Sequence, residues 1–381
     1  MFLLFFVLST KNKKISTLCV LCVSSEAGGE KIRNIGEKIM GDGKFIYGFV
    51  STNERQSLGF MGIDRGEVSI FPYQDVAAVV SDLPFTEFDS LPKETLILNL
   101  AVYQAVIERV MKGSHIIPVK FGTMIEGEEE LKRVLENGYG SISENLKQME
   151  GKIELNVAAV WSDLETVLKE IGEEEGIKRL KEEAVSKAPD EVFEIKISVG
   201  RLVKESLDKR KEECASLILD VLKKEAEDHC THAMMDDSMI VNTAFLINKD
   251  QQTEFERKVE ELDSHFQDTI NFRIVGPLPP YSFSTFEITK IEFAELNQAR
   301  EMLGLSKEFA PVEIRDTYWG LTKKFHPDKF PGDSEAQERF EEITKAYQML
   351  TEYCQEDRCS FKEADVREWI SVRPVAQQAT M

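Results

Sequence analysis

The chain has 381 residues, a formal net charge of −21 and 42% hydrophobic residues. This length is typical of two or three domains, and the acidity argues against nucleic acid as the main partner, because phosphate binding needs clustered cations. Six cysteines at irregular spacing do not indicate a disulfide framework in so long a chain. We therefore expect reduced thiols in a cytosolic protein.

Residues 1–40 do not match the rest of the chain. Their apolar runs, Phe2–Leu8 and Ile15–Val23, are shorter than the about 20 residues that a membrane span needs. Lysines before the second run leave open a signal peptide with an unusual n-region. Because a strand pattern follows soon after Met40, we favour a mis-assigned start or a non-core extension.

A first α+β domain is predicted over residues 41–150. Strands are expected over four apolar runs, at 45–50, 68–71, 76–80 and 115–122. Helices are expected over 92–111, where Pro92 suits the first turn, and over the acidic amphipathic stretch 127–149.

A second α+β domain is predicted over residues 151–288. Its expected elements are strands at 153–161, 239–247 and 270–275, a helix at 251–266, and a long charged helical region at 164–228 that is interrupted near Pro189. Both domains are ferredoxin-like in their order of elements. The prolines of 277–280 predict an extended tail, because proline is excluded from helix and sheet interiors.

The segment His229-Cys230-Thr231-His232 carries side chains that bind metals, since imidazole and thiolate are metal ligands. Its ligands are adjacent, lie at the expected frayed end of a helix and lack a second spaced cluster. We therefore expect no metal there.

The C-terminal part carries a His-Pro-Asp triplet at 326–328 between two amphipathic patterns. Apolar residues recur on one helical face before it and again after it: Ile314, Tyr318, Leu321 and Phe325, then Phe340, Ile343, Ala346, Tyr347 and Leu350. Two such helices joined by a short polar loop form an antiparallel hairpin. A short linker, 288–292, is expected to precede this part.

This segment resembles the J-domain, the module that stimulates DnaK-type chaperone ATPases. The resemblance covers about residues 291–370 and is clearest up to 353, with the first helix and its exit turn at 299–305 and further helices at 311–325 and 334–353. We assign 291–373 to this all-α domain and 374–381 to a tail.

The resemblance implies which residues of this chain bind the chaperone. His326, Pro327 and Asp328 would contact its ATPase and linker region, and nearby cations would face an acidic surface, namely Arg315, Lys323, Lys324 and Lys329. Trp319 stands where the family usually has a basic or polar residue. It is either a surface aromatic that alters partner affinity or a residue that packs on an additional C-terminal helix.

Residues 43–286 resemble the gas vesicle protein family GvpL/GvpF. The matching segments are Lys44–Val50, His115–Thr123, Val241–Ile247 and, most specifically, the Gly-Pro-x-Pro-Pro-Tyr-Ser-Phe signature. Leu278 stands there where some members have tryptophan. Members have two α+β domains, act as accessory or minor structural proteins in gas vesicle assembly, and are thought to bind the small hydrophobic shell protein.

The Pro-rich tail supplies the candidate client-binding residues, Pro277, Pro279, Pro280, Tyr281 and Phe283. Bracing of the domain is the favoured alternative for them. The two resemblances together predict a cytoplasmic, gas vesicle-associated assembly protein that binds shell protein and recruits a DnaK-type chaperone beside it. The alternative is a minor structural component of the vesicle with a non-recruiting J-like domain.

An enzyme is not indicated. No paired-carboxylate, Cys/His or Ser/His constellation occurs in a supporting context, and no glycine-rich stretch has the Gly-Lys-Ser/Thr of a phosphate loop. We expect no catalytic residue, no cofactor and no membrane span.

Overall fold

The computed structural model describes residues 42–185, 187, 189–290, 292–326, 329, 334–354, 359–361 and 369–375. The described residues form two compact units. One is Lys152–Leu278, and the other combines residues 42–151 with residues 279–375. The prediction for residues 1–40 lies outside the described residues. The boundary expected at 288 falls at 278 instead, because the chain from Pro279 onward packs with the first domain.

The first domain is an antiparallel sheet with strand order β2-β3-β4-β1-β5, and β6 pairs with β1. Its strands are β1 (Asp42–Ser51), β2 (Gln56–Phe60), β3 (Glu67–Tyr73), β4 (Val76–Pro84), β5 (Ile116–Pro118) and β6 (Met124–Glu126), and its helices are α1 (Lys93–Met111) and α2 (Gly127–Gln148). Short 3-10 turns lie at η1 (Ile63–Arg65) and η2 (Phe88–Ser90).

Strand β1 is buried on both faces. Its Tyr47 ring stacks on Tyr103 of α1, while Ile46 and Phe49 join the apolar cluster that α2 covers. Strand β2 was not predicted because its polar, largely exposed sequence lacks an apolar alternation. The strand expected over 115–122 is only three residues long, and the chain turns at Gly122, whose φ is +89°.

A two-stranded ribbon adds to this domain from far along the chain. Strand β11 (Thr285–Lys290) pairs antiparallel with β14 (Ile370–Val375), with Lys290 opposite Ile370. Val372 packs on α2 at Gly138, where an added Cβ would lie 2.6 Å from the Val372 Cγ1. The expected linker at 288–292 therefore begins inside a strand, and residues assigned to the tail from 374 begin in β14.

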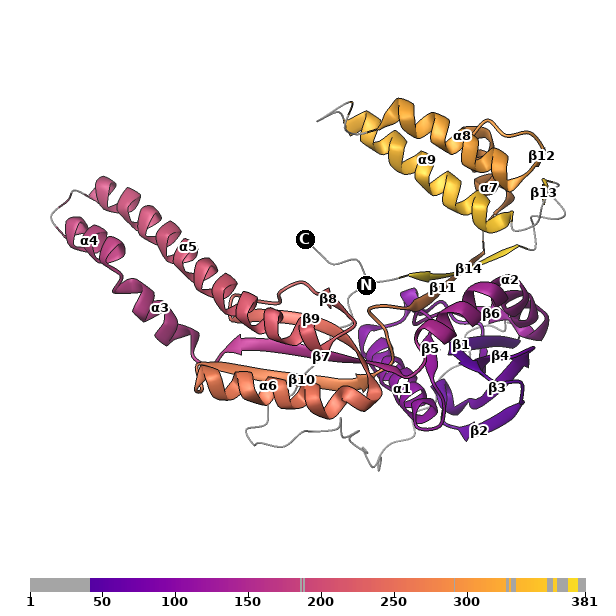
Figure 1. Cartoon of the computed structure of the whole chain (residues 1–381), viewed down its shortest axis with the longest axis horizontal. Coiled ribbons are helices and arrows are strands. Elements are labelled where there is room, and N and C mark those ends of the chain that lie inside the picture. The colour runs from indigo at the N-terminus through magenta and orange to yellow at the C-terminus, as the bar shows by residue number, and fades with distance from the viewer. Residues whose placement is uncertain are drawn as a thin grey trace, which may run out of the picture. The chain divides into compact units, whose positions relative to one another are not determined.

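The other unit is an antiparallel sheet with strand order β10-β7-β9-β8. Its elements are β7 (Lys152–Trp161), α3 (Leu164–Gly172), α4 (Glu175–Ala184), α5 (Pro189–Leu222), η3 (Lys223–Glu225), β8 (Asp228–Thr231), β9 (Met239–Asn248), η4 (Lys249–Gln251), α6 (Gln252–Phe266) and β10 (Ile270–Leu278). Figure 1 shows α3 and α4 running along α5, and α6 lying against the sheet.

Two expectations for this unit need correction. The helical region ends at Leu222, so His229 and Cys230 lie on strand β8 and not at a frayed helix end. Strand β10 continues through Pro277 with a register shift between Val275 and Leu278. Proline is tolerated there because β10 is an edge strand.

The C-terminal helices are α7 (Phe293–Met302), α8 (Pro311–Phe325) and α9 (Ser334–Tyr353), with the short strands β12 (Glu308–Phe309) and β13 (Cys359–Ser360). The predicted bounds of the second and third helices are confirmed. Their apolar stripes meet around Ile314, Ile343 and Leu350. The expected α+β fold with a C-terminal helical domain is thus confirmed.

A disulfide joins Cys354, just after α9, to Cys359 of β13. The Cα atoms lie 5.6 Å apart, a separation that suits such a bond. The expectation that all cysteines are reduced is therefore wrong for this pair. Among the helices of the described residues, none has the length and apolarity needed to cross a bilayer.

Candidate functional site

Helix α8 presents one apolar face to the rest of its domain and one charged face outward. Pro311 occupies its first turn, where a missing N–H is harmless, and the Glu313 carboxylate accepts the Ala310 N–H at 2.8 Å. On the inner face, the Tyr318 ring stacks on Tyr347 of α9 with centroids 4.1 Å apart. This stacking fixes the rotation of α8 about its axis.

The outer face of α8 carries Arg315, Lys323 and Lys324, all exposed. Among the described residues none of the three forms an ion pair with a carboxylate. The reason is local, because the positions three and four residues away within the helix hold no acidic side chain. Lys323 and Lys324 lie in the last turn, where the helix dipole favours cations.

The predicted chaperone-contacting loop begins where α8 ends. His326 follows the helix with extended backbone and is exposed, and its ring meets Phe340 of α9 edge-on at 5.7 Å. The Lys329 N–H donates to the His326 carbonyl at 2.9 Å, and the Lys329 ammonium donates to the Lys323 carbonyl at 2.6 Å. Lys329 is therefore bonded to the last turn of α8 and to the residue that follows it. Pro327 and Asp328 lie outside the described residues.

Trp319 lies on the outer face of α8 and is 58% exposed. Its ring meets only the neighbouring Tyr318 edge-on, at 6.2 Å between centroids, among the described aromatic rings. Residues 355–358 and 362–368, where an additional C-terminal helix would follow α9, lie outside the described residues. The first of the two interpretations, a surface aromatic, therefore fits the structure.

The end of α9 is bonded to the ribbon. The Glu352 carboxylate accepts the Ser371 hydroxyl at 2.5 Å and the Val372 N–H at 3.0 Å. Sequence reasoning missed this contact, although the alternation of Ile370 and Val372 was a visible strand signal. The helical domain is thus bonded to the same strand that packs on α2.

A half-buried charge network ties the ribbon to the sheet. Glu287 of β11 accepts from Lys120 at 2.6 Å and from Arg373 at 3.2 Å. The hydrogen bond from Lys120, with a smaller contribution from Arg373, lowers the pKa of the Glu287 carboxyl. The carboxylate is therefore favoured in the folded chain.

The Pro-rich segment is largely internal. Pro279, Pro280 and Tyr281 are buried, and the Tyr281 hydroxyl donates to the Gln104 side-chain oxygen of α1 at 2.7 Å. Phe283 is half-buried and Pro277 is exposed. These positions support bracing as the role of the three buried residues, and the client-binding prediction now depends on Pro277 and Phe283.

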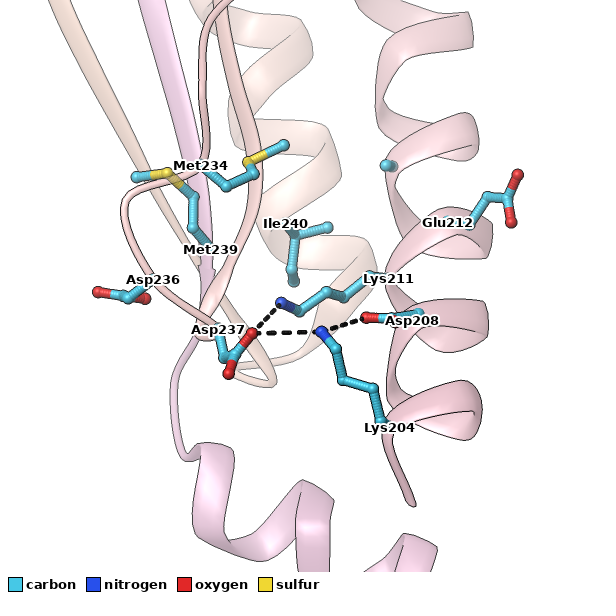
Figure 2. Close-up of a pocket in the computed structure, with 10 residues that line it drawn as sticks. Lys204, Asp208, Lys211, Glu212, Met234, Asp236, Asp237, Met239 and Ile240 are labelled. Atoms are coloured by element: carbon cyan, nitrogen blue, oxygen red, sulfur yellow. Dashed lines mark hydrogen bonds and ion pairs between the residues drawn. The ribbon is translucent and has the colours of Figure 1, made fainter. Parts of the chain in front are cut away.

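An open hollow of about 670 Å³ lies between α5 and the connection from β8 to β9 (Figure 2). Lys204 and Lys211 both reach the Asp237 carboxylate, at 3.5 and 3.9 Å, and Lys204 also pairs with Asp208 at 3.1 Å. The cations are thus neutralised from within. No group of three or more metal-ligating side chains occurs in the described part of the chain.

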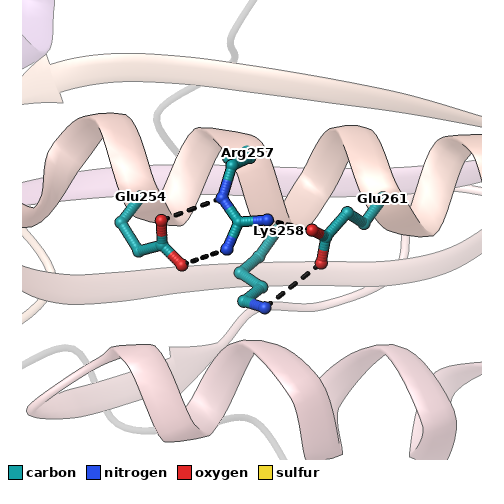
Figure 3. Close-up of polar contacts among 4 residues, drawn as sticks. All are labelled: Glu254, Arg257, Lys258 and Glu261. Carbon is teal, nitrogen blue, oxygen red and sulfur yellow. Dashed lines mark hydrogen bonds and ion pairs between the residues drawn. The ribbon is translucent and has the colours of Figure 1, made fainter.

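Helix α6 carries a second exposed charged face (Figure 3). Arg257 donates to Glu254 at 2.5 and 2.9 Å and also to Glu261, and Lys258 pairs with Glu261 at 3.2 Å. The hydrogen bond from Arg257 lowers the pKa of Glu254. The cations of this face are satisfied within their own helix.

Comparison with known proteins finds two matches that divide the chain. Residues 43–285 match the family described as gas vesicle synthesis protein GvpL/GvpF, and residues 292–358 match the DnaJ domain. Gas vesicle protein F of Streptomyces sp. (strain CB03234) is 27% identical over 242 residues, which cover 63% of this chain and 98% of the relative. Chaperone protein DnaJ of Chlamydia abortus is 48% identical over 52 residues, 14% of this chain and 13% of that protein.

The fold is also similar to solved structures. The crystal structure of the gas vesicle protein GvpF from Anabaena sp. PCC7120 aligns with a TM-score of 0.56 and 23% identity, over 64% of this chain and 98% of that one. The GvpF structure from Microcystis aeruginosa gives a TM-score of 0.50 at 23% identity. These likenesses establish the fold of the region before α7.

Proposed function

The chain belongs to the GvpL/GvpF family of gas vesicle synthesis proteins and carries a DnaJ domain, and from this premise we propose that it is a co-chaperone of gas vesicle assembly. It binds the hydrophobic shell protein and recruits a DnaK-type chaperone through α8 and the His326 loop. It acts in the cytoplasm, where the shell protein and other gas vesicle proteins are its partners.

The observation that carries this proposal is a set of cations on α8, unpaired among the described residues, beside an exposed His326. The whole chain has a net charge of −21, so a basic helix face is an exception on it. Such a face suits an acidic partner surface, because complementary charge speeds encounter. A J-domain implies a DnaK-type chaperone as that partner.

The apolar surface of the proposed client, the shell protein, explains why a chaperone is needed. A shell that excludes water must be apolar on one face, and before assembly that face aggregates. Holding the chaperone next to the bound client raises its effective concentration there. We propose no catalytic residue in this chain, so any ATP is hydrolysed by the partner.

The test is single-turnover ATP hydrolysis by a DnaK-type chaperone with the full chain added. We expect stimulation by the intact chain, further stimulation when shell protein is present, and none with His326→Gln. Lys258→Gln is the matched control, because it removes a cation that is already paired on α6. It should stimulate as the intact chain does.

Two results would overturn the proposal in different ways. If the intact chain does not stimulate hydrolysis at any concentration, chaperone recruitment is excluded and a structural role in the vesicle becomes the better interpretation. If stimulation occurs but shell protein neither binds the chain nor changes the rate, the client assignment is wrong.

A further inference from the structure

The disulfide between Cys354 and Cys359 lies inside the apolar cluster of the helical domain, and both residues are buried. The cysteines are five positions apart and join the end of α9 to the short strand β13. Disulfides are rare in the cytosol of most organisms, and those that occur there are usually transient or redox-sensing. In the cytoplasm, where we place this chain, the bond would therefore be exchanged rather than permanent.

Each cysteine is held in place by contacts other than the disulfide. The Cys354 N–H donates to the Leu350 carbonyl in the last turn of α9, at 2.9 Å. Cys359 pairs with Phe309 of β12, and the Phe361 ring packs near Phe309 with the centroids 6.4 Å apart. Two thiols held this close react as neighbours, because a fixed orientation replaces a chance encounter. The bond can therefore form again after it has been reduced.

A small local opening is enough to reach the buried bond. The ladder between β12 and β13 has only two residue pairs, Glu308 with Ser360 and Phe309 with Cys359. So short a ladder can open at a lower free energy than the domain as a whole. A reductant can therefore reach the sulfur atoms while the helices remain folded.

The disulfide lies beside the attachment of the helical domain to the ribbon. Glu352 precedes Cys354 by two positions and accepts the Val372 N–H of β14 at 3.0 Å. The Tyr353 ring meets Trp369, which directly precedes β14, edge-on at 5.6 Å. Fraying of the last turn of α9 would move both side chains away from β14. A covalent bond at Cys354 opposes such fraying, because it restricts the open states of the chain.

We propose that Cys354 and Cys359 form a redox switch that sets how firmly the helical domain is held to the ribbon. The oxidised chain keeps the end of α9 and β14 together, and the reduced chain lets them separate. This inference rests on the proposed function only for the cytoplasmic location.

The switch is set by exchange with a small-molecule disulfide, such as oxidised glutathione. One cysteine thiolate attacks that disulfide, forms a mixed disulfide and expels one small thiolate. The second cysteine thiolate then attacks the protein sulfur, closes the bond between Cys354 and Cys359 and expels the other. The two cysteines lose two electrons and their two protons, and the small disulfide takes up both to become two thiols. An excess of reduced glutathione drives the same steps backwards.

The first test places the full chain in mixtures of reduced and oxidised glutathione that span the cytosolic range. Alkylation and peptide mass spectrometry report each cysteine separately. We expect the bond between Cys354 and Cys359 to form and to break within that range. A bond that survives the most reducing mixture would be a permanent staple. That result would overturn the proposal, as would thiols that survive the most oxidising mixture or pair with another molecule.

Hydrogen exchange of the full chain then compares the two redox states. Reduction should speed exchange at the Cys354 and Val372 amides by about tenfold or more, because the closed loop no longer limits local opening. Amides of β9, in the other compact unit, should not change and serve as the internal reference. Equal exchange in the two states would show a bond that does not control the attachment, and the proposal would be wrong. The comparison needs no substitution, so misfolding of a variant cannot hide the answer.

A variant without the two thiols should behave as the reduced chain does. Cys354→Ser with Cys359→Ser should exchange at the fast rate in both glutathione mixtures. Cys214→Ser is the matched control, because Cys214 of α5 is a free, half-buried thiol whose pKa is raised by burial, which leaves it less reactive. It should respond as the intact chain does, and loss of the response in this control would place the switch elsewhere. None of these measurements uses the chaperone or the shell protein, so their failure and that of the proposed function are distinguishable.

Discussion

Helices α6 and α8 both present charged faces to solvent. The cations of α6 pair with carboxylates of their own helix, whereas those of α8 do not. On α6, Arg257 and Lys258 are held by Glu254 and Glu261 within the same helix. On α8, Arg315, Lys323 and Lys324 have no acidic residue three or four positions away inside the helix. Charge composition alone does not separate the two faces, but the spacing of opposite charges does.

This difference has a physical consequence for binding. A cation that already has an acid partner must give up that partner before it can meet another protein, so its net contribution is small. An unpaired cation keeps its full long-range field. We therefore expect the α8 face to act in recognition and the α6 face to act only in local helix stability.

The largest effect is expected when the charges of the α8 cations are reversed. A parallel variant reverses the charges of the paired cations of α6. Lys323→Glu with Lys324→Glu should reduce ATPase stimulation by at least about tenfold, because like charges would face an acidic partner. Arg257→Glu with Lys258→Glu changes the net charge by the same amount and should leave stimulation unchanged. Equal loss in both double variants would show that overall charge, and not the α8 face, matters.

A change in ionic strength should also test whether the α8 cations act in recognition. Raising salt from about 50 mM to about 300 mM should slow chaperone association several-fold, because the Debye length shortens. Stopped-flow mixing measures this rate. In the Lys323→Glu/Lys324→Glu variant the salt dependence should vanish or change sign, and a dependence equal to that of the intact chain would contradict the recognition role of α8.

The half-buried Glu287, which lies between Lys120 and Arg373, should contribute more to the free energy of unfolding than the exposed ion pairs of α6. Glu287→Gln should lower the free energy of unfolding by about 1 kcal/mol at neutral pH, because a charge-assisted hydrogen bond is lost. Urea unfolding measures it. Lys249→Gln serves as the control, because Lys249 is exposed and forms no ion pair among the described residues.

The pH dependence gives the sign of that contribution. Because the pKa of Glu287 is lower in the folded chain than the ordinary glutamate value of 4.5, the contribution is present above that value. It is lost as the pH falls below 4.5 and through the folded pKa. The stability difference between the intact chain and Glu287→Gln should therefore shrink in acid, and a difference that grows would refute this assignment.

The smallest expected effect concerns exposed charge. Arg257→Ala should lower the free energy of unfolding only slightly, because solvent screens its ion pairs. Arg315→Ala should change it less, since Arg315 forms no ion pair among the described residues. Chemical unfolding of both variants decides, and a larger loss for Arg315 would reveal an intramolecular role for the α8 face.

The helical hairpin of α8 and α9 could be predicted from the sequence, but its attachment to the ribbon of β11 and β14 could not. Pro311 and the apolar stripes set α8 and α9, because those signals lie within each helix. The ribbon depends on pairing between Phe286 and Pro374, 88 positions apart, which no local pattern specifies. The disulfide between Cys354 and Cys359 spans only five positions, but cysteine spacing alone does not specify which cysteines pair.

Some features of the candidate site could likewise be predicted from the sequence, and others could not. That Lys323 lacks an acidic neighbour could be read from helical spacing, and the residue types at 326–328 carried the resemblance. That Trp319 remains exposed required the structure, because an aromatic on a helix is more often buried. Burial of Tyr281 likewise depended on Gln104, which lies 177 positions earlier.

The ribbon makes the helical domain a removable cassette. The chain enters it after Lys290 and leaves it before Ile370, and these two residues are opposite each other in the ladder. A two-residue turn such as Asn-Gly can close that gap as an ordinary hairpin. The rest of the chain would then keep both strands of the ribbon and lose only the helical domain. The domain can thus be removed without removing β14, and other domains can be inserted between the same two residues.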